Sequence, residues 1–148
     1  MSLLSRKGIL AVAAVVDVAL YSRSRPVSAK ALALRHGLPP RHLEPVLQAL
    51  VHDGILRGIR GPRGGYELGR EPAAVTVTDI LRAAGTVDGS DNPALPGSVL
   101  VEKVVLFAIA QAEKLFAAAL DEIHLADLVK QADTIRDAGH SEPIKLNG

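Results

Sequence analysis

Apolar side chains recur at intervals of three or four residues over three segments in the first third of the chain, which predicts three helices. The first covers residues 5–22, and the second covers 29–36 between a Ser28 cap and Gly37. The third begins at Pro40 and ends at Gly54. The apolar positions of the three segments are Ile9, Val12, Ala13, Val16, Ala19 and Leu20, then Leu32 and Ala33, then Leu43, Val46, Leu47 and Leu50.

After Gly54 the pattern changes from helical to extended. Residues 55–60 and 66–68 are predicted to form two strands joined by a Gly-Pro-Arg-Gly-Gly turn at 61–65. Three helices followed by a basic hairpin are typical of a winged helix-turn-helix, in which the third helix enters the major groove of DNA. A Gly-rich basic loop also suits nucleotide phosphates, but the chain has no G-x-x-x-x-G-K-[ST] motif.

The second half of the chain is predicted to be helical and to form a dimer. Thr76 and Asp79 have the spacing of a capping box for a short helix that ends at Ala84. Residues 85–97 predict a flexible loop, and one long helix follows from Ser98 to about Ile123. Its apolar residues form two stripes, and one small domain is not expected to cover both. A partner helix from a second copy is therefore expected on the first stripe, and a core helix wrapped by its own chain is the alternative. The first stripe is Val101, Val105, Ala108, Ala112, Leu115 and Ala119, and the second is Leu106, Ile109, Phe116, Leu120 and Ile123.

These elements predict a mostly α protein with a small β-hairpin. We expect a winged helix-turn-helix domain over 1–84, the flexible loop over 85–97, a dimerisation helix with a short terminal helix over 98–136, and a flexible tail over 137–148. The terminal helix is expected over 125–133.

Composition narrows the chemistry that is open to the chain. None of the 148 residues is cysteine, which excludes disulfides, thiolate zinc sites, Cys-ligated iron–sulfur clusters and a cysteine nucleophile. The five histidines are scattered, no metal site is assigned, and no catalytic constellation of side chains is present. No apolar run is long enough to span a bilayer and no signal peptide is indicated, so we expect a cytoplasmic protein.

The charge is divided unequally along the chain. Residues 1–70 hold eleven Lys and Arg against four Asp and Glu, a net of +7, whereas residues 71–148 hold six against twelve, a net of −6. Such asymmetry favours a nucleic-acid-binding N-terminal half, and chance clustering on a solvated surface is the alternative.

One stretch of the sequence resembles a known family. His42 to Leu50, then Gly54-Ile55-Leu56, then Arg60-Gly61-Pro62-Arg63-Gly64-Gly65-Tyr66-Glu67-Leu68 resemble the Rrf2 family of bacterial transcriptional regulators. The resemblance extends from the first helix to about residue 131, and it implies a homodimer that binds a palindromic promoter site. Many members hold an iron–sulfur cluster with three cysteines before the long helix, and here that loop has none.

Several residues are candidates for contacts with DNA. Arg41 and His42 are the leading candidates for base edges, although a phosphate contact is equally open for Arg41. Glu44 suits a cytosine amino group, and surface exposure alone is its alternative. Arg60 and Arg63 are the candidates on the wing, with Gly64 in its turn, where glycine permits close backbone approach. Arg6, Lys7 and Ser28 are candidates for backbone phosphates, Ser28 being equally explained as a cap; Gln48 is expected to be exposed or structural.

The sequence thus predicts a dimeric, sequence-specific DNA-binding regulator, expected to be a repressor and not an enzyme. The alternative is a protein-interaction module whose exposed helix binds a partner such as a metabolic enzyme. A protein or small-molecule effector remains open.

Overall fold

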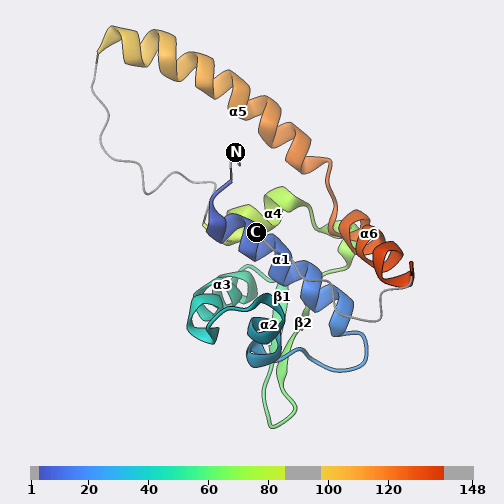
Figure 1. Ribbon diagram of the computed structural model, residues 1–148. Coiled ribbons are helices and arrows are strands. Elements are labelled where there is room, and N and C mark those ends of the chain that lie inside the picture. Colours follow the sequence, from blue (N-terminus) through green and yellow to red (C-terminus); the bar gives the residue numbers. More distant parts are fainter. Residues whose placement is uncertain (1–3, 86–97, 139–148) are drawn as a thin grey trace.

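The computed structural model describes residues 4–85 and 98–138 (Figure 1). The prediction of a mostly helical fold with one two-stranded antiparallel hairpin is confirmed. The elements in chain order are α1 (Arg6–Tyr21), α2 (Ala29–His36), α3 (Pro40–His52), β1 (Leu56–Ile59), β2 (Gly65–Leu68), the 3-10 turn η1 (Pro72–Ala74), α4 (Val77–Ala83), the π-helical segment η2 (Leu100–Val105), α5 (Leu106–Asp121) and α6 (Leu125–Asp137).

Short polar side chains cap the helices where the sequence places them. The Ser5 and Ser28 hydroxyls accept hydrogen bonds from the N–H groups of Gly8 and Ala31, at 3.1 and 3.0 Å. Thr76 and Asp79 form the predicted reciprocal capping box at the start of α4. Each cap satisfies an N–H that has no partner inside its helix, which fixes where the helix begins.

The core is aliphatic and lies among α1, α3, α4 and the base of the hairpin. All four apolar residues predicted for α3 are buried, and the helix continues through Pro45 after a first turn in which the N–H of His42 bonds the carbonyl of Pro39 at 3.0 Å. In α1 the predicted face is buried only in part. Ala19 and Leu20 are buried as predicted, but Ile9 is 45% exposed, and the fully buried positions are Ala11, Ala14, Val15 and Val18. Apolar residues occur on more than one side of this helix, so spacing alone does not select the side that the core covers.

The hairpin is fixed to the helices rather than standing alone. β1 and β2 pair from Leu56 with Leu68 to Ile59 with Gly65. Val27, just before α2, bonds Tyr66 through both backbone groups, at 2.9 and 2.7 Å. A Cβ on Gly65 would overlap the carbonyl of Val27, so only glycine permits this approach. The hairpin, which we call the wing, and helices α1 to α4, which we call the body, therefore form one unit.

The long helix extends away from that unit. The helical run that begins with the Ser98 cap is π-helical over η2 before it becomes α5, which ends at Asp121, two residues before the predicted end. Figure 1 shows α5 extending from the body on the side away from the hairpin tip. No residue of η2 or α5 is buried, although many of them are apolar. The side chains of Val105, Phe107, Ile109 and Leu115 are each at least 42% exposed. The second stripe is only partly covered, at Phe116 and Leu120.

The chain returns to the body through α6, which is longer than the predicted terminal helix. Leu125 is fully buried, and its N–H donates to the carbonyl of Val75 at 2.8 Å. A further backbone bond joins Val77 to Ile123 at 2.9 Å. Nearly all of the predicted loop, and most of the predicted tail, lie outside the described residues. Among the helices that the structure describes, none is both long and apolar enough to cross a membrane.

Candidate nucleic-acid interface

The outward face of α3 carries polar side chains of different hydrogen-bonding character. Arg41, Glu44, Pro45 and Gln48 are all exposed, and the four buried residues of the helix lie on its other side. His42 is exposed as well, beside the edge of the buried stripe. The face thus offers a donor fork, a carboxylate acceptor, an apolar ring and a carboxamide, which are groups that distinguish base edges in a major groove.

The hairpin presents two arginines to solvent and uses two others structurally. Arg60 and Arg63 are exposed and make no ion pair or hydrogen bond in the described part of the chain. Arg57 instead pairs with Glu67 across the hairpin, its Nε donating to Oε1 at 2.9 Å. Arg70 donates to the carbonyl of Asp53 at 2.8 Å and so joins the base of the hairpin to the end of α3.

The turn between the strands needs glycine for two reasons. Gly61 has φ of 114°, a region that L side chains rarely adopt. A Cβ on Gly64 would overlap the carbonyl oxygen of Ile59 within the hairpin itself. Gly64, which the sequence proposes for close approach to DNA, is therefore already required by the shape of the turn.

The start of α2 lies next to the wing because Val27 pairs with Tyr66. Ser28 follows immediately, half-buried, with its hydroxyl accepting from Ala31. Lys30 is exposed on the first turn of α2, and Arg25 is exposed on the segment before it. Sequence analysis counted these two cations in the charge excess but did not name them as candidates. Only the structure distinguishes them from the cations that are paired within the chain.

The eleven cations of residues 1–70 fall into a paired set and an unpaired set. Four are engaged within the chain: Arg23, Arg35, Arg57 and Arg70. The other seven are exposed, and among the described residues none of them has an ion-pair or hydrogen-bond partner. They are Arg6, Lys7, Arg25, Lys30, Arg41, Arg60 and Arg63. They lie on α1, on α3, on the wing and at the start of α2, so this part of the surface carries uncompensated positive charge.

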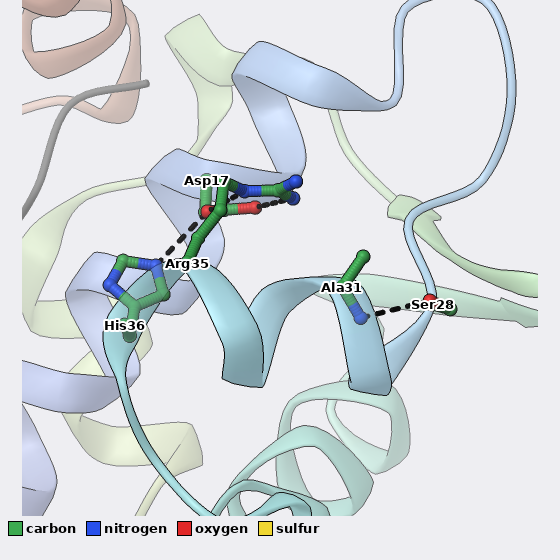
Figure 2. A network of polar contacts seen from close by, with 5 residues as sticks. All are labelled: Asp17, Ser28, Ala31, Arg35 and His36. Atoms are coloured by element: carbon green, nitrogen blue, oxygen red, sulfur yellow. Dashed lines mark hydrogen bonds and ion pairs between the residues drawn. The ribbon is translucent and has the colours of Figure 1, made fainter. Parts of the chain in front are cut away.

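A buried carboxylate holds α2 against α1. Figure 2 shows Asp17 of α1 facing Arg35 and His36 at the end of α2. The Nε and a terminal nitrogen of Arg35 donate to the two carboxylate oxygens at 2.8 and 2.7 Å, and Nε2 of His36 lies 3.0 Å from Oδ2. Burial acts to raise the pKa of Asp17, but the hydrogen bonds from Arg35 and His36 outweigh it and hold that pKa below its ordinary value.

A second set of contacts joins α6 to the same place. The Arg35 guanidinium lies over the ring of Tyr21 at 4.1 Å, and that of Arg136 on α6 lies 5.1 Å from the same ring. Arg23 and Asp133 form a bidentate ion pair, with oxygen–nitrogen distances of 2.7 and 3.3 Å. These contacts attach α6 beside the end of α1 and the end of α2, the helix that precedes α3.

In the described residues, no three His, Cys, Asp or Glu side chains gather where they could hold a metal ion. The chain has no cysteine at all, so it has no thiolate to ligate an iron–sulfur cluster. A Cys-ligated cluster does not fit this protein.

The fold and the exposed cations define a winged helix-turn-helix protein of the DNA-binding class. A family model described as Rrf2, iron-dependent transcriptional regulator, matches residues 4–131, and the chain belongs to this family. It is therefore a transcriptional regulator and not an enzyme, and it is a member without cysteine.

Individual relatives agree with this assignment. The chain is 30% identical over 137 residues to the HTH-type transcriptional regulator IscR of Yersinia enterocolitica, covering 91% of this chain and 84% of the relative. Among solved structures, IscR of T. potens superposes with a TM-score of 0.71 and 32% identity, covering 94% and 92% of the two chains. CymR, the global cysteine regulator of B. subtilis, superposes with a TM-score of 0.68 and 30% identity, covering 88% and 98%.

The ion pairs of α1 and α6 differ in burial, and that difference predicts their effects on stability. We expect Asp17→Ala to lower the free energy of unfolding by about 3 kcal/mol, because it leaves the partly buried guanidinium of Arg35 and the buried ring of His36 without an acceptor. Asp133→Ala, which removes a solvent-exposed pair, is the matched control and should change stability far less. Urea unfolding followed by circular dichroism measures both; equal losses would contradict the structural role of Asp17.

The lowered pKa of Asp17 also predicts an acid dependence. A carboxyl group whose pKa is lower in the folded state stabilises the fold above its ordinary pKa of 3.8, and that contribution is lost as the pH falls through the folded value. The stability difference between wild type and Asp17→Ala should therefore shrink as the pH drops below 3.8. Unfolding curves collected from neutral pH downward test this, and a difference that does not depend on pH would refute it.

Proposed function

We propose that the protein is a homodimeric, sequence-specific DNA-binding repressor that acts without a Cys-ligated cluster. In each protomer α3 enters the major groove, with Arg41, His42 and Glu44 near its start. Arg60 and Arg63 extend from the wing toward the minor groove or its phosphates, and Gly64 lets the turn approach the backbone. Arg6, Lys7 and Ser28 contact phosphates, and we add Lys30 and Arg25 to this set.

The observation that carries this proposal is the pairing of the cations. Residues 1–70 hold only four Asp and Glu against eleven Lys and Arg, and two of these carboxylates, Asp17 and Glu67, are already paired with Arg35 and Arg57. The paired arginines hold elements together, and seven exposed cations without partners in the described structure remain on the helices and the wing. Seven exposed cations per protomer are enough to neutralise several phosphates. Neutralisation of phosphates is the main source of affinity for DNA.

The proposal of a dimer rests on α5. Its predicted stripe, from Val101 to Ala119, has no residue that the body buries, and Leu115 is 75% exposed. A soluble chain does not keep so much contiguous apolar surface in water, and a second copy of the same helix offers a matching stripe. The half-exposed face of α1 at Ile9, Val12 and Val16 supplies further apolar surface for a second protomer.

Repression follows from occupancy. A dimer presents two recognition helices to a two-fold site, and a bound dimer on a promoter excludes polymerase with no further activity of the chain. The absence of thiolates means that release from DNA is not controlled by a Cys-ligated cluster.

The wing arginines give the direct test of DNA binding. We expect the purified protein to bind a fluorescent duplex of the DNA upstream of its own gene, with a log–log salt slope of about −6 to −10. Arg60→Gln or Arg63→Gln should each reduce the magnitude of that slope by about two per dimer, one per protomer.

The control for this experiment is Arg82→Gln, which removes an exposed charge from α4 and should leave the slope unchanged. Fluorescence anisotropy at several salt concentrations, with a scrambled duplex for comparison, measures each variant. Absence of binding at low salt would refute the proposal and favour the protein-interaction module; reversal of Arg60 and Arg63 to Glu should spare binding to a protein partner.

Dimerisation is tested by two alanines on α5 that differ in the face they occupy. Ala112 belongs to the proposed stripe and Ala117 lies on the far side of the helix, and both are exposed. We expect Ala112→Lys to shift the protein to monomer, because it buries two charges against each other at the interface, while Ala117→Lys stays dimeric. Sedimentation velocity distinguishes them, and a wild type that sediments as a monomer would overturn the dimer.

A further inference from the structure

The angular position of each residue on α3 decides which side chains face outward. An α-helix turns by about 100° per residue, so residues seven apart return to nearly the same side. Leu43 and Leu50 are such a pair on the buried side, and both are fully buried. Arg41 and Gln48 are the corresponding pair on the outward side, and both are exposed. Gln48 therefore lies at the centre of the outward face, almost directly opposite the core.

His42 occupies a different place. It precedes the buried Val46 by four residues, so it lies above Val46 at the margin of the buried stripe, about 100° around the helix from Arg41. Its side chain is exposed, but toward the flank of α3 rather than its centre. The sequence favours His42 over Gln48 as a candidate for contacts with base edges, and the geometry of α3 favours Gln48 over His42.

The surroundings of Gln48 leave its carboxamide available. Its neighbours on the outward face one turn away are Glu44 and His52, and in the described structure neither makes a hydrogen bond with it. Pro45, on the same face, has neither an N–H nor a polar side chain to compete for the carboxamide. A carboxamide donates and accepts side by side, which matches the N6 and N7 pattern of adenine in the major groove.

We propose, on the basis of the function proposed above, that Gln48 is a specificity-determining residue that reads one adenine in each half-site. His42 contributes little to base choice. The Pro45 ring, beside Gln48, provides an apolar surface suited to a thymine methyl group.

The test is in vitro selection from a library of randomised DNA duplexes, carried out with wild type, Gln48→Ala, Gln48→Glu and His42→Ala. Gln48→Ala should lose preference for adenine at one position per half-site, by roughly fivefold to a hundredfold, with an unchanged salt slope. Gln48→Glu should change the selected base at that position from adenine to cytosine, because a carboxylate accepts from the cytosine amino group. His42→Ala should select the same sequence as wild type.

A change of the selected base is an outcome that a merely structural role of Gln48 does not produce. Since Gln48 is exposed, both variants should unfold at the same temperature as wild type. If wild type selects a site and the Gln48 variants select that same site, the inference is overturned and the proposed function stands. Loss of one base preference in His42→Ala instead would assign the reading to His42. If wild type selects no sequence, the proposed function fails and the inference fails with it.

Discussion

The placement of α2 depends on one buried carboxylate. This helix has eight residues and buries only Leu32 and Ala33, too little apolar surface to fix its orientation by packing. Asp17 supplies what is missing, because it accepts from Arg35 and His36 at the far end of α2. The near end is held where Val27 pairs with Tyr66 of the wing. With both ends fixed, α2 in turn supports α3, and the three helices and the hairpin keep a constant relation.

Electrostatics divide the molecule into a part that is internally satisfied and a part that is not. Arg23, Arg35, Arg57 and Arg70 connect α6, α2, the two strands and the end of α3. Because these four are used as connectors, the exposed cations left over, together with the exposed side chains of α3, are available to a polyanion. Arginine thus serves both the scaffold and the proposed interface, and pairing rather than burial separates the two roles, because Arg23, Arg57 and Arg70 are exposed as well.

The apolar surface is divided in a similar way. The core of the body is closed by aliphatic side chains of α1, α3, α4 and Leu125, while α5 contributes no buried residue. Leu125 and the pairing of Arg23 with Asp133 attach α6 firmly to the body, so the end of α5 is anchored beside the helix-turn-helix. A partner that covers α5 would therefore be placed at a defined position relative to α3.

The sequence by itself determined the helices, their caps and the hairpin, because these depend on local periodicity and on side chains that satisfy nearby backbone groups. It also determined the four buried residues of α3, the absence of thiolate chemistry and the family, whose wing motif lies in one continuous stretch. Tertiary structure alone decided which side of the first part of α1 is buried, since apolar residues occur on more than one side of that helix, whereas Ala19 and Leu20 near its end are buried as predicted. It also decided which arginines are paired, because Asp17 with Arg35 and Arg23 with Asp133 meet across helices that sequence spacing cannot relate. The exposure of both Gln48 and His42 agrees with the rotation of α3 that its four buried residues fix, with Gln48 at the centre of the outward face and His42 at its margin.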